Sequence, residues 1–528
     1  MIQRWMALSL LLILLAGCGG SPSSASTGTS GPGGPQELTV ALVADVVTFD
    51  PLDIQDVPSS DVAGNVMETL VRRDEQGNII PHLAESWTVS DDGLTWTFHL
   101  RQGVKFQDGS PFDAHVVKWQ FNRVMFDENA PVRARKQFLD AIESMEVPDD
   151  YTIAFHLRAP NAAFMELVLL QNAAMIASKE NFDKLGQADY ARHPVGTGPF
   201  IFQAWVPGQL VVLRKNPDYW GEKAKLDTLI FRPIPEANTQ VIELETGGIQ
   251  VATKVGVEDI GRLRNNPDVE VLSTPSYQIR FLRLNGTNEL LSDIRVRQAI
   301  NYAIDVPTIV KTLVGEMGVY NPSAVMPTAS WAHPGDMPTY GYDPQKAAQL
   351  LEEAGWTLGP GGVRYKDGRP LKITFLSPNG RYFADKEIAE AVKKALQDVG
   401  FQVDLKVMEW AAFLEDYRAG RFDIALGGWN QSSPEPSLFL DAMVMTGGRA
   451  NYSKYSDPEI DQWLEEALLT PDREERAALY RKVILKVHDL AWFVPLYDEN
   501  KVVAIRKEVK GYIFTPAFTR FDTIYIQR

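Results

Sequence analysis

Four side chains in the last third of the chain could hold a solute by ionic, aromatic and polar contacts. Arg381 carries a guanidinium suited to a carboxylate, while Trp410 and Trp429 carry flat indole rings. Ser432 adds a hydroxyl that can donate or accept a hydrogen bond. This combination is typical of a ligand cleft.

No catalytic motif accompanies these residues. The sequence has no Gly-x-Ser-x-Gly elbow, no phosphate-binding Gly-x-x-x-x-Gly-Lys-Ser/Thr loop and no His-Glu-x-x-His zinc site. The seven histidines are scattered, and His99 and His156 fall on alternating strands, where a hydrogen-bonded structural role is expected. We therefore expect neither a cofactor nor a histidine metal site.

The elements that must position the four side chains form a β-α-β-α-β unit. They are a strand at 371–377, a helix that ends at Gly400, a strand at 401–407, a helix at 410–419 and a strand at 422–426. Right-handed crossovers make the strands parallel. The loops after them, 377–383, 408–410 and 427–436, then meet at the carboxyl edge of the sheet, where ligand crevices lie.

Each candidate also has a structural interpretation. Trp429 could pack in the core, and Gly427-Gly428 before it allows close approach of either a ligand or a neighbouring helix. We favour the ligand because the position is at the sheet edge. For Trp410 the two interpretations are balanced, and Arg381 alone would more often be a solvated loop residue. Glu435, between two prolines, is expected at the surface.

The first third of the chain predicts hairpins and one clear helix. Strands at 86–90 and 94–100 flank a glycine turn, and strands at 142–147 and 151–157 flank Pro148-Asp149-Asp150. Between them, Asp113 caps a helix with apolar residues at a 3.6-residue period. A strand at 37–44 precedes a loop that contains Phe49.

The amino terminus predicts export and a lipid anchor. Arg4 and the apolar run 5–15 precede Leu15-Ala16-Gly17-Cys18, and this run is too short to span a bilayer, which needs about 20 residues. The tetrapeptide resembles the lipobox of bacterial lipoproteins, which implies cleavage of a signal peptide at 1–17 and lipidation of Cys18. An ordinary signal peptide with an incidental cysteine is the alternative. The uncharged Gly/Ser/Pro-rich segment up to residue 36 predicts a flexible tether.

Composition narrows the function classes further. The chain has 528 residues, 45% of them hydrophobic and 23% charged, which is ordinary for a globular protein. Its net charge of −16 becomes −17 without residues 1–17, so nucleic acid is not an expected partner. Cys18 is the only cysteine, so no internal disulfide exists.

Four longer segments together carry a family likeness. They are Leu83-Ala-Glu-Ser-Trp87, Leu94-Thr-Trp-Thr-Phe-His-Leu-Arg-Gln-Gly-Val-Lys-Phe-Gln-Asp-Gly109, Pro194-Val-Gly-Thr-Gly-Pro-Phe200 and Asp293-Ile-Arg-Val-Arg-Gln-Ala-Ile-Asn-Tyr-Ala-Ile-Asp305. In this order the chain, from about Leu38 to Ile526, resembles the oligopeptide- and dipeptide-binding proteins of bacterial ABC importers, the extracellular solute-binding family 5.

The resemblance implies an α/β periplasmic-binding-protein-like fold of type II, with two lobes joined by two strand crossovers and a ligand cleft between them. Lobe I would comprise 37–65, 185–275 and 495–528, with an extra subdomain at 66–184. Lobe II would comprise 276–494.

The resemblance also assigns ligand residues. Trp410 falls where peptide binders place a cleft tryptophan, and Trp429-Asn430-Gln431-Ser432 aligns with Trp-x-x-Asp, whose aspartate pairs with a peptide's ammonium. Here Ser432 replaces that aspartate, and Glu435 is the nearest acid that could substitute for it. The carboxylate-binding arginines of tripeptide binders fall near Tyr417 and Leu426, and Arg381 lies close to the position used by dipeptide binders. Phe49, Tyr277 and Gly428 complete the expected set.

The function implied is that of a monomeric, lipid-anchored receptor outside the cytoplasmic membrane. It would deliver a peptide-like solute to an ABC permease, with energy from a partner ATPase. Glutathione, an oligosaccharide or a metal chelate stay open as solutes, and the run from Gly428 through Asn451-Tyr452 to Leu479-Tyr480 resembles the glutathione-binding branch. A lipid-anchored hydrolase with a carboxylate pair is the competing class.

Overall fold

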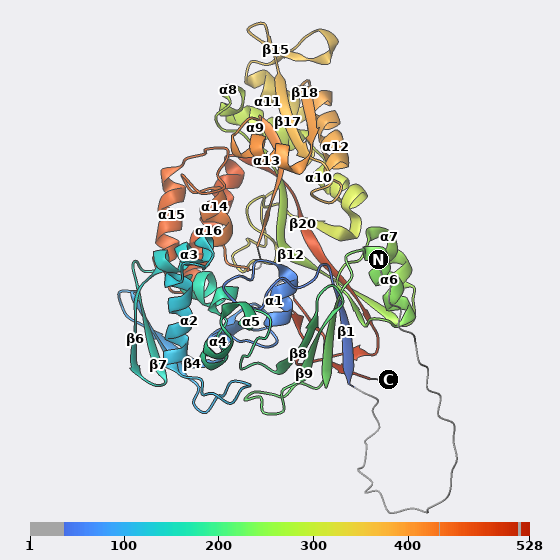
Figure 1. Ribbon diagram of the computed structural model, residues 1–528. Helices are drawn as coiled ribbons and strands as arrows, with labels where there is room; N and C mark the ends of the chain where they lie inside the picture. The colour runs from blue at the N-terminus through green and yellow to red at the C-terminus, as the bar shows by residue number, and fades with distance from the viewer. Residues whose placement is uncertain (1–35, 432, 516–518, 528) are drawn as a thin grey trace, which may run out of the picture.

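The structure, a computed structural model, describes residues 36–431, 433–515 and 519–527. Figure 1 shows a broad lower body, which holds both ends of the described chain, beneath a narrower upper body. The predicted signal peptide, Cys18 and all of the predicted tether except Gln36 lie outside the described residues. We use lobe I, subdomain and lobe II for the predicted ranges; their exact boundaries stay predictions.

One sheet runs through both lobes, in the strand order β18-β17-β19-β12-β20-β11-β1-β10-β9-β8, with β13 (Gly318–Tyr320) paired to β20. In lobe I, β1 is parallel to β10 and β11, and the strands beyond β10 are antiparallel. The lobe I strands are β1 (Glu37–Leu42), β8 (Phe200–Val206), β9 (Leu210–Lys215), β10 (Thr228–Pro233) and β11 (Val251–Ala252).

Two long strands cross from one lobe to the other, as predicted. β12 (Val269–Leu284) and β20 (Phe493–Arg506) pair with each other on both sides of a register shift between Pro275 and Ile279. At the shift, residues 276–278 of β12 oppose only Glu499 of β20, which makes a bulge. Because a bulge bends a strand and interrupts its ladder, these residues are the natural hinge between the lobes.

The predicted β-α-β-α-β unit of lobe II is confirmed. Strand β17 lies between β18 and β19 and is parallel to both. Helix α12 buries Ile388, Val392 and Leu396 at the spacing of one helix face. The unit consists of β17 (Lys372–Pro378), α12 (Asp385–Asp398), β18 (Gln402–Met408), α13 (Trp410–Arg418) and β19 (Ile424–Asn430).

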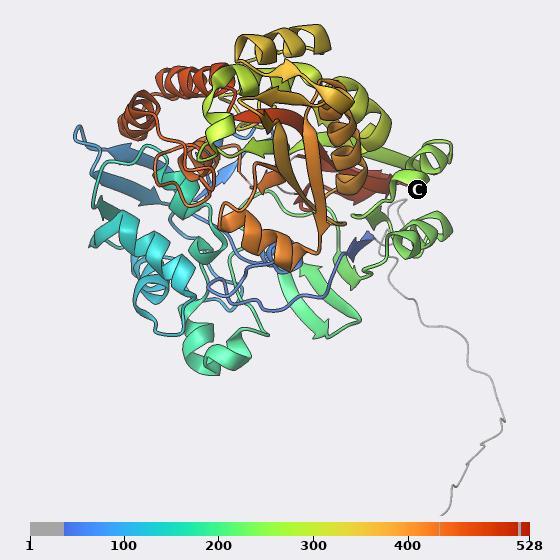
Figure 2. The same ribbon diagram turned by 90° about the horizontal axis from the view of Figure 1, so that it is seen from above.

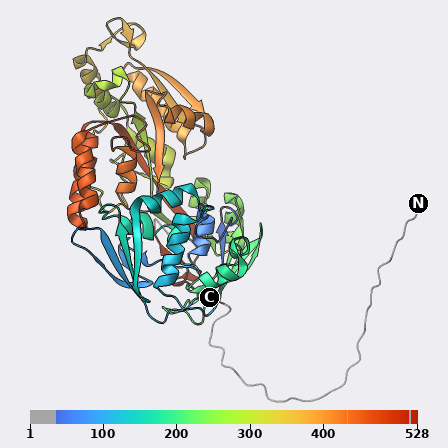
Figure 3. The ribbon, with the colours of Figure 1, turned by 60° about the vertical axis from the view of Figure 1, so that its left-hand side comes forward.

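Further helices and a small three-stranded sheet complete lobe II. The sheet forms its tip in Figure 1, and α15 and α16 descend along one side toward the subdomain (Figures 1 and 3). These elements are α8 (Glu289–Ser292), α9 (Ile294–Ala303), α10 (Val306–Ile309), α11 (Pro344–Glu353), β14 (Thr357–Leu358), β15 (Arg364–Lys366), β16 (Arg369–Pro370), α14 (Ser437–Met443), α15 (Pro458–Leu469) and α16 (Arg473–Asp489).

The subdomain contains both predicted hairpins and the predicted helix. Its four strands are antiparallel in the order β4-β5-β7-β6, and Asp113 caps α2 by accepting the N–H of Val116 at 2.9 Å. His156 contacts Thr95 across β5 and β7 at 3.1 Å, in agreement with a structural role. The elements are β2 (Val71–Arg73), β3 (Ile79–Pro81), β4 (Ala84–Val89), β5 (Thr95–Leu100), α2 (Ala114–Phe126), α3 (Val132–Ala141), β6 (Ile142–Asp149), β7 (Thr152–Leu157) and α4 (Lys179–Leu185).

Short helices cover the remaining surface of lobe I. They are α1 (Val57–Ala63), α5 (Gln187–Tyr190), α6 (Ala237–Thr246) and α7 (Val257–Arg264). The chain returns to lobe I in four short strands, β21 (Val509–Lys510), β22 (Ile513–Phe514), β23 (Thr519–Arg520) and β24 (Tyr525–Ile526). Among the described helices, none combines the length and the apolar character needed to cross a bilayer. Seen from above, α13 of lobe II overlies α1 of lobe I (Figure 2).

Candidate functional site

The structure brings Arg381 and Trp410 together at the carboxyl edge of the lobe II sheet. The Asp385 carboxylate accepts the backbone N–H of Gly380, Arg381 and Tyr382 at 2.8–3.0 Å, which fixes the loop after β17. The exposed guanidinium of Arg381 then lies 4.8 Å from the centre of the half-buried Trp410 ring. This pair, which we call the lobe II platform, offers a positive charge over an aromatic face.

Arg280, beside the platform, was missed by sequence reasoning. Its side chain is 3% exposed, lies 4.5 Å from the centre of the Tyr382 ring and pairs with Glu499 in the hinge. Its Nη1 donates to Oδ1 of Asn430 at 2.8 Å, so part of this predicted ligand residue is already engaged. Two arginines, Arg280 and Arg283, inside the otherwise apolar run of 279–284 were the available signal, because a buried guanidinium needs partners.

The space beside the two glycines before Trp429 is filled by protein. A Cβ at Gly428 would lie 2.8 Å from Nη1 of Arg280, and one at Gly427 would lie 2.5 Å from the Tyr417 hydroxyl of α13. Trp429 itself donates from Nε1 to the carbonyl of Leu438 at 2.9 Å and packs against the α14 core. These contacts favour packing within lobe II for Gly428 and Trp429, both of which are half-buried, and a ligand contact at these two residues stays a prediction.

Three other predicted residues lie away from open surface. The Phe49 ring is 0% exposed and packs edge-on against Phe202 and Trp205, so it belongs to the lobe I core. Tyr277 is 5% exposed in the hinge bulge. Glu435 was expected at the surface, but it is fully buried and near Arg476 at 3.7 Å. Ser432 lies outside the described residues.

The subdomain and lobe II touch each other in this structure. Arg73 of β2 donates to the Ser433 hydroxyl at 3.0 Å and pairs with Glu166, which also accepts the Ser433 hydroxyl at 2.9 Å. The N–H of Ala162 donates to the carbonyl of Leu468 at 2.8 Å, at the end of α15 (Figure 3). The contacts define a closed side of the cleft, opposite the hinge strands.

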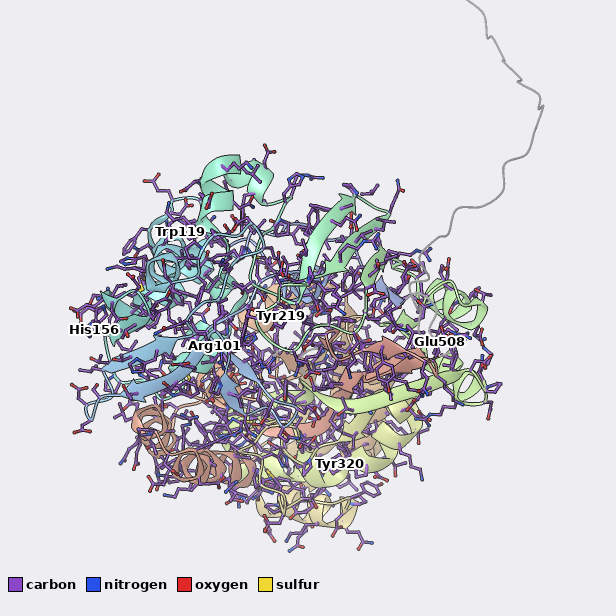
Figure 4. All side chains as sticks on the ribbon, turned by 90° about the horizontal axis from the view of Figure 1, so that it is seen from below. Arg101, Trp119, His156, Tyr219, Tyr320 and Glu508 are labelled. Carbon is purple, nitrogen blue, oxygen red and sulfur yellow. The ribbon has the colours of Figure 1, made fainter. Side chains whose placement is uncertain are left out.

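A cavity of about 280 Å³ adjoins this contact on the lobe I side. Arg73 belongs to its wall, and no residue of lobe II does. Tyr219, another wall residue, lies near the middle of the molecule when it is viewed from below (Figure 4). The wall consists of residues 60, 61, 64, 65, 67–69, 72, 73, 82, 170, 172, 175, 199, 219 and 519–522.

Glu68 organises one wall of this cavity. Its carboxylate accepts from the hydroxyls of Thr197 at 2.7 Å and Tyr219 at 2.6 Å and from Nε1 of Trp220 at 2.9 Å, and it pairs with His82 at 2.9 Å. Burial alone would raise its pKa, but the charge of His82 and these hydrogen bonds hold the pKa of Glu68 at about 2. The wall is therefore rigid and preformed.

The described residues contain no group of three or more His, Cys, Asp or Glu side chains that could hold a metal ion. The described residues offer two surfaces to a solute, which are the lobe II platform and the lobe I cavity.

Comparisons with known proteins agree with this architecture. The family model of bacterial extracellular solute-binding proteins, family 5 (middle region), matches residues 78–451. The glutathione-binding protein GsiB of Salmonella paratyphi A is 31% identical over 495 residues, which cover 91% of this chain and 92% of that protein. The dipeptide-binding protein of Escherichia coli K12 is 30% identical over 460 residues, covering 83% and 84%. The solved structure of HbpA2 from Haemophilus parasuis superposes with a TM-score of 0.86 at 27% identity, covering 93% of this chain and 100% of that one.

Proposed function

Because this chain belongs to the bacterial extracellular solute-binding proteins of family 5, we propose that it captures a peptide-like solute outside the cytoplasmic membrane. It delivers the solute chemically unchanged to the permease of an ABC importer, whose ATPase supplies the energy. The family to which the chain belongs consists of binding proteins of ABC importers.

The observation that carries this proposal is the pair of strands that joins the lobes. β12 and β20 continue through both halves of one sheet, and their pairing shifts register at residues 276–278 and again between Arg280 and Phe281. Such a joint lets each lobe move as a rigid body while its own core stays packed. A solute that contacts both lobes favours the closed arrangement, since it binds that state better.

The chemistry of the platform supports a peptide-like solute. The exposed guanidinium of Arg381 suits a carboxylate, and the Trp410 ring, which stacks on Phe413 at 5.5 Å between ring centres, supports that guanidinium from below. Two of the relatives carry names that specify glutathione and dipeptides. Oligosaccharides and metal chelates are alternative outcomes of the experiment below.

The experiment is to identify the solute that co-purifies with the protein. Mass spectrometry after mild denaturation should release a peptide or glutathione, unchanged after incubation with protein, and its return should lower the radius of gyration in X-ray scattering. A sugar or chelate in its place would refute the peptide-like class. A chemically altered solute would refute the receptor and favour a hydrolase.

The lipid anchor is a separate part of the proposal. Cys18→Ser should move the protein from the membrane fraction to the soluble fraction and leave solute affinity unchanged, since the sequence from Gly19 to Gln36 after it contains no charged residue and consists only of Gly, Ser, Pro, Thr, Ala and Gln, a composition that favours a flexible segment. Ser21→Ala is the matched control and should stay at the membrane. Membrane retention of Cys18→Ser would contradict anchoring at this residue.

A further inference from the structure

Most charged groups in the wall of the lobe I cavity already have partners. Arg73 pairs with Glu166, Arg520 pairs with Asp522, and Glu68 accepts three hydrogen bonds and pairs with His82. These groups shape the cavity and hold one another in place. They have little left to offer a solute.

Two wall residues of opposite charge are exceptions. Arg72, at the centre of β2, makes no side-chain hydrogen bond or ion pair with the part of the chain that the structure describes, and its Nε is buried. Asp61, on α1, likewise accepts no side-chain hydrogen bond and has no cation within ion-pair distance among the described residues. Both side chains are half-buried, so each charge has lost part of its hydration without a protein partner in exchange.

Lys501, the cation whose charge influences Asp61, does not pair with its carboxylate. Burial raises its pKa to about 6, with the charge of Asp56 adding to the rise and that of Lys501 opposing it. The Lys501 ammonium instead donates to the carbonyl of Thr515 at 3.2 Å and faces the Phe514 ring. A cation placed in the cavity would therefore find an acceptor that the protein itself leaves open.

We propose that this cavity is a subsite for a small zwitterionic solute, in which Arg72 binds a carboxylate and Asp61 binds an ammonium group. The inference rests on the proposed function and names the solute class for one side of the cleft. Two opposite charges that share a wall without pairing can both be satisfied by one molecule that carries the two complementary charges. The volume of about 280 Å³ is near the lower end of typical small-molecule sites, ~300–1,000 Å³, which suits a solute of about dipeptide size.

Calorimetry with three probes tests the assignment. The probes are Ala-Ala, its C-terminal amide and its N-acetyl derivative, so that each blocked form removes one charge. The wild-type protein should bind Ala-Ala at least tenfold more tightly than either blocked form. Arg72→Met should reduce the preference over the amide severalfold, with Arg381 of lobe II supplying the remainder, and leave the preference over the acetylated form unchanged. Asp61→Asn should abolish the preference over the acetylated form only.

Two measurements exclude a merely structural role. Ligand-free Arg72→Met should unfold at the same denaturant concentration as wild type or higher, because the arginine has no protein partner to lose. Arg369→Met, which removes an exposed arginine at the tip of lobe II, should leave every probe ratio unchanged. Persistence of both probe preferences in the two cavity variants would overturn the inference, as would failure of Ala-Ala to bind wild type.

The result is separable from the fate of the proposed function. If wild type and Arg72→Met retain the same co-purifying solute equally well, the inference fails while the receptor function stands. If no unaltered solute binds either protein, the proposed function fails first.

Discussion

Two buried glutamates, Glu68 in the subdomain and Glu435 in lobe II, show that the two sides of the cleft are built differently. Glu68 is 5% exposed and Glu435 is 0% exposed, so both carboxylates have left water. The first is met by two hydroxyls, an indole N–H and a histidine. Its pKa is held at about 2, which means that the folded protein favours the charged form strongly.

Glu435 has far fewer hydrogen-bond and charge partners than Glu68. Its nearest cation, Arg476, is 3.7 Å away, the Tyr480 hydroxyl is 3.4 Å away, and Oε2 has no hydrogen-bond donor among the described residues. Burial raises its pKa, opposed by Arg476 and reinforced by the charge of Glu166. Asp441 nearby has a buried, unpartnered Oδ1, and burial together with the charge of Glu435 raises its pKa to about 7.

The carboxylate of Glu68 therefore stabilises its side of the cleft, whereas that of Glu435 destabilises the other side. A buried charge with full coordination fixes its surroundings, whereas a buried charge with partial coordination destabilises them until a proton or a partner arrives. Glu68 thus keeps the lobe I cavity preformed. Glu435 lies directly behind Ser433, the residue that contacts Arg73 and Glu166. The charges of Glu435 and Asp441 therefore destabilise this side of lobe II increasingly as pH rises.

Removing the charge of Glu68 should give the largest effect. In Glu68→Gln one of the two oxygens that accept three hydrogen bonds and face His82 becomes an NH₂ group, so we expect a loss of about 3 kcal/mol of unfolding free energy. In wild type the same stabilisation is complete above pH ~4.5 and is lost as pH falls through about 2, because the folded pKa lies below the unfolded one. Denaturant unfolding followed by circular dichroism measures both.

Glu85→Gln is the control for this prediction, because Glu85 is exposed on β4. It should change stability by less than about 0.5 kcal/mol. An equally small loss in Glu68→Gln would show that the four contacts do not stabilise lobe I.

Removing the charge of Asp441 should have the opposite sign and a smaller size. Its pKa is raised in the folded protein, so its charge destabilises the fold increasingly as pH rises from about 4 to about 7. Asp441→Asn should therefore match wild type at pH 4 and exceed it by about 1–2 kcal/mol at pH 8. Asp336→Asn, at an exposed position, should show no such divergence between the two pH values. A constant difference at both pH values would contradict the assignment of the cost to this carboxyl.

The sequence predicted the elements of lobe II well, because local periodicity decides them. Ile388, Val392 and Leu396 mark one helix face and do become the buried face of α12. Alternation in 401–407 and the glycines at 400 and 420 set the other limits. The resemblance supplied the crossing strands, which no local pattern could reveal, since they pair residues more than 200 positions apart.

Side-chain directions at the site were harder to predict. Arg381 and Trp410 meet because both follow parallel strands at one sheet edge, which topology fixes. Trp429 lies near the end of β19 at the same edge, yet its ring turns to the α14 side, and the space beside Gly428 is taken by Arg280 from a strand of the hinge. Which face of a strand end meets solvent depends on such distant partners. The wall of the cavity with Arg72 and Asp61 comes from the subdomain, α1 and the carboxyl end of the chain, so no pattern within a single segment of the sequence predicts this cavity.

The smallest expected effect concerns Glu435 and solute affinity. If this acid replaced the missing aspartate opposite an ammonium group, Glu435→Gln would weaken binding at least tenfold, or about 1.4 kcal/mol. The buried position of its side chain behind Ser433 predicts instead that affinity for Ala-Ala changes by less than about twofold. Calorimetry at pH 7 decides between the two.

Arg381→Gln, on the exposed platform, is the comparison for Glu435→Gln and should weaken binding of the same probe about tenfold, because it removes the cation above Trp410. The buried variant must first be shown to keep its fold, since Arg476 loses its nearest acid there. A folded Glu435→Gln protein that binds Ala-Ala tenfold more weakly would mean that Glu435 reaches the solute after all. Glu435 would then bind the solute, and the conclusion that its buried charge only destabilises lobe II would be wrong.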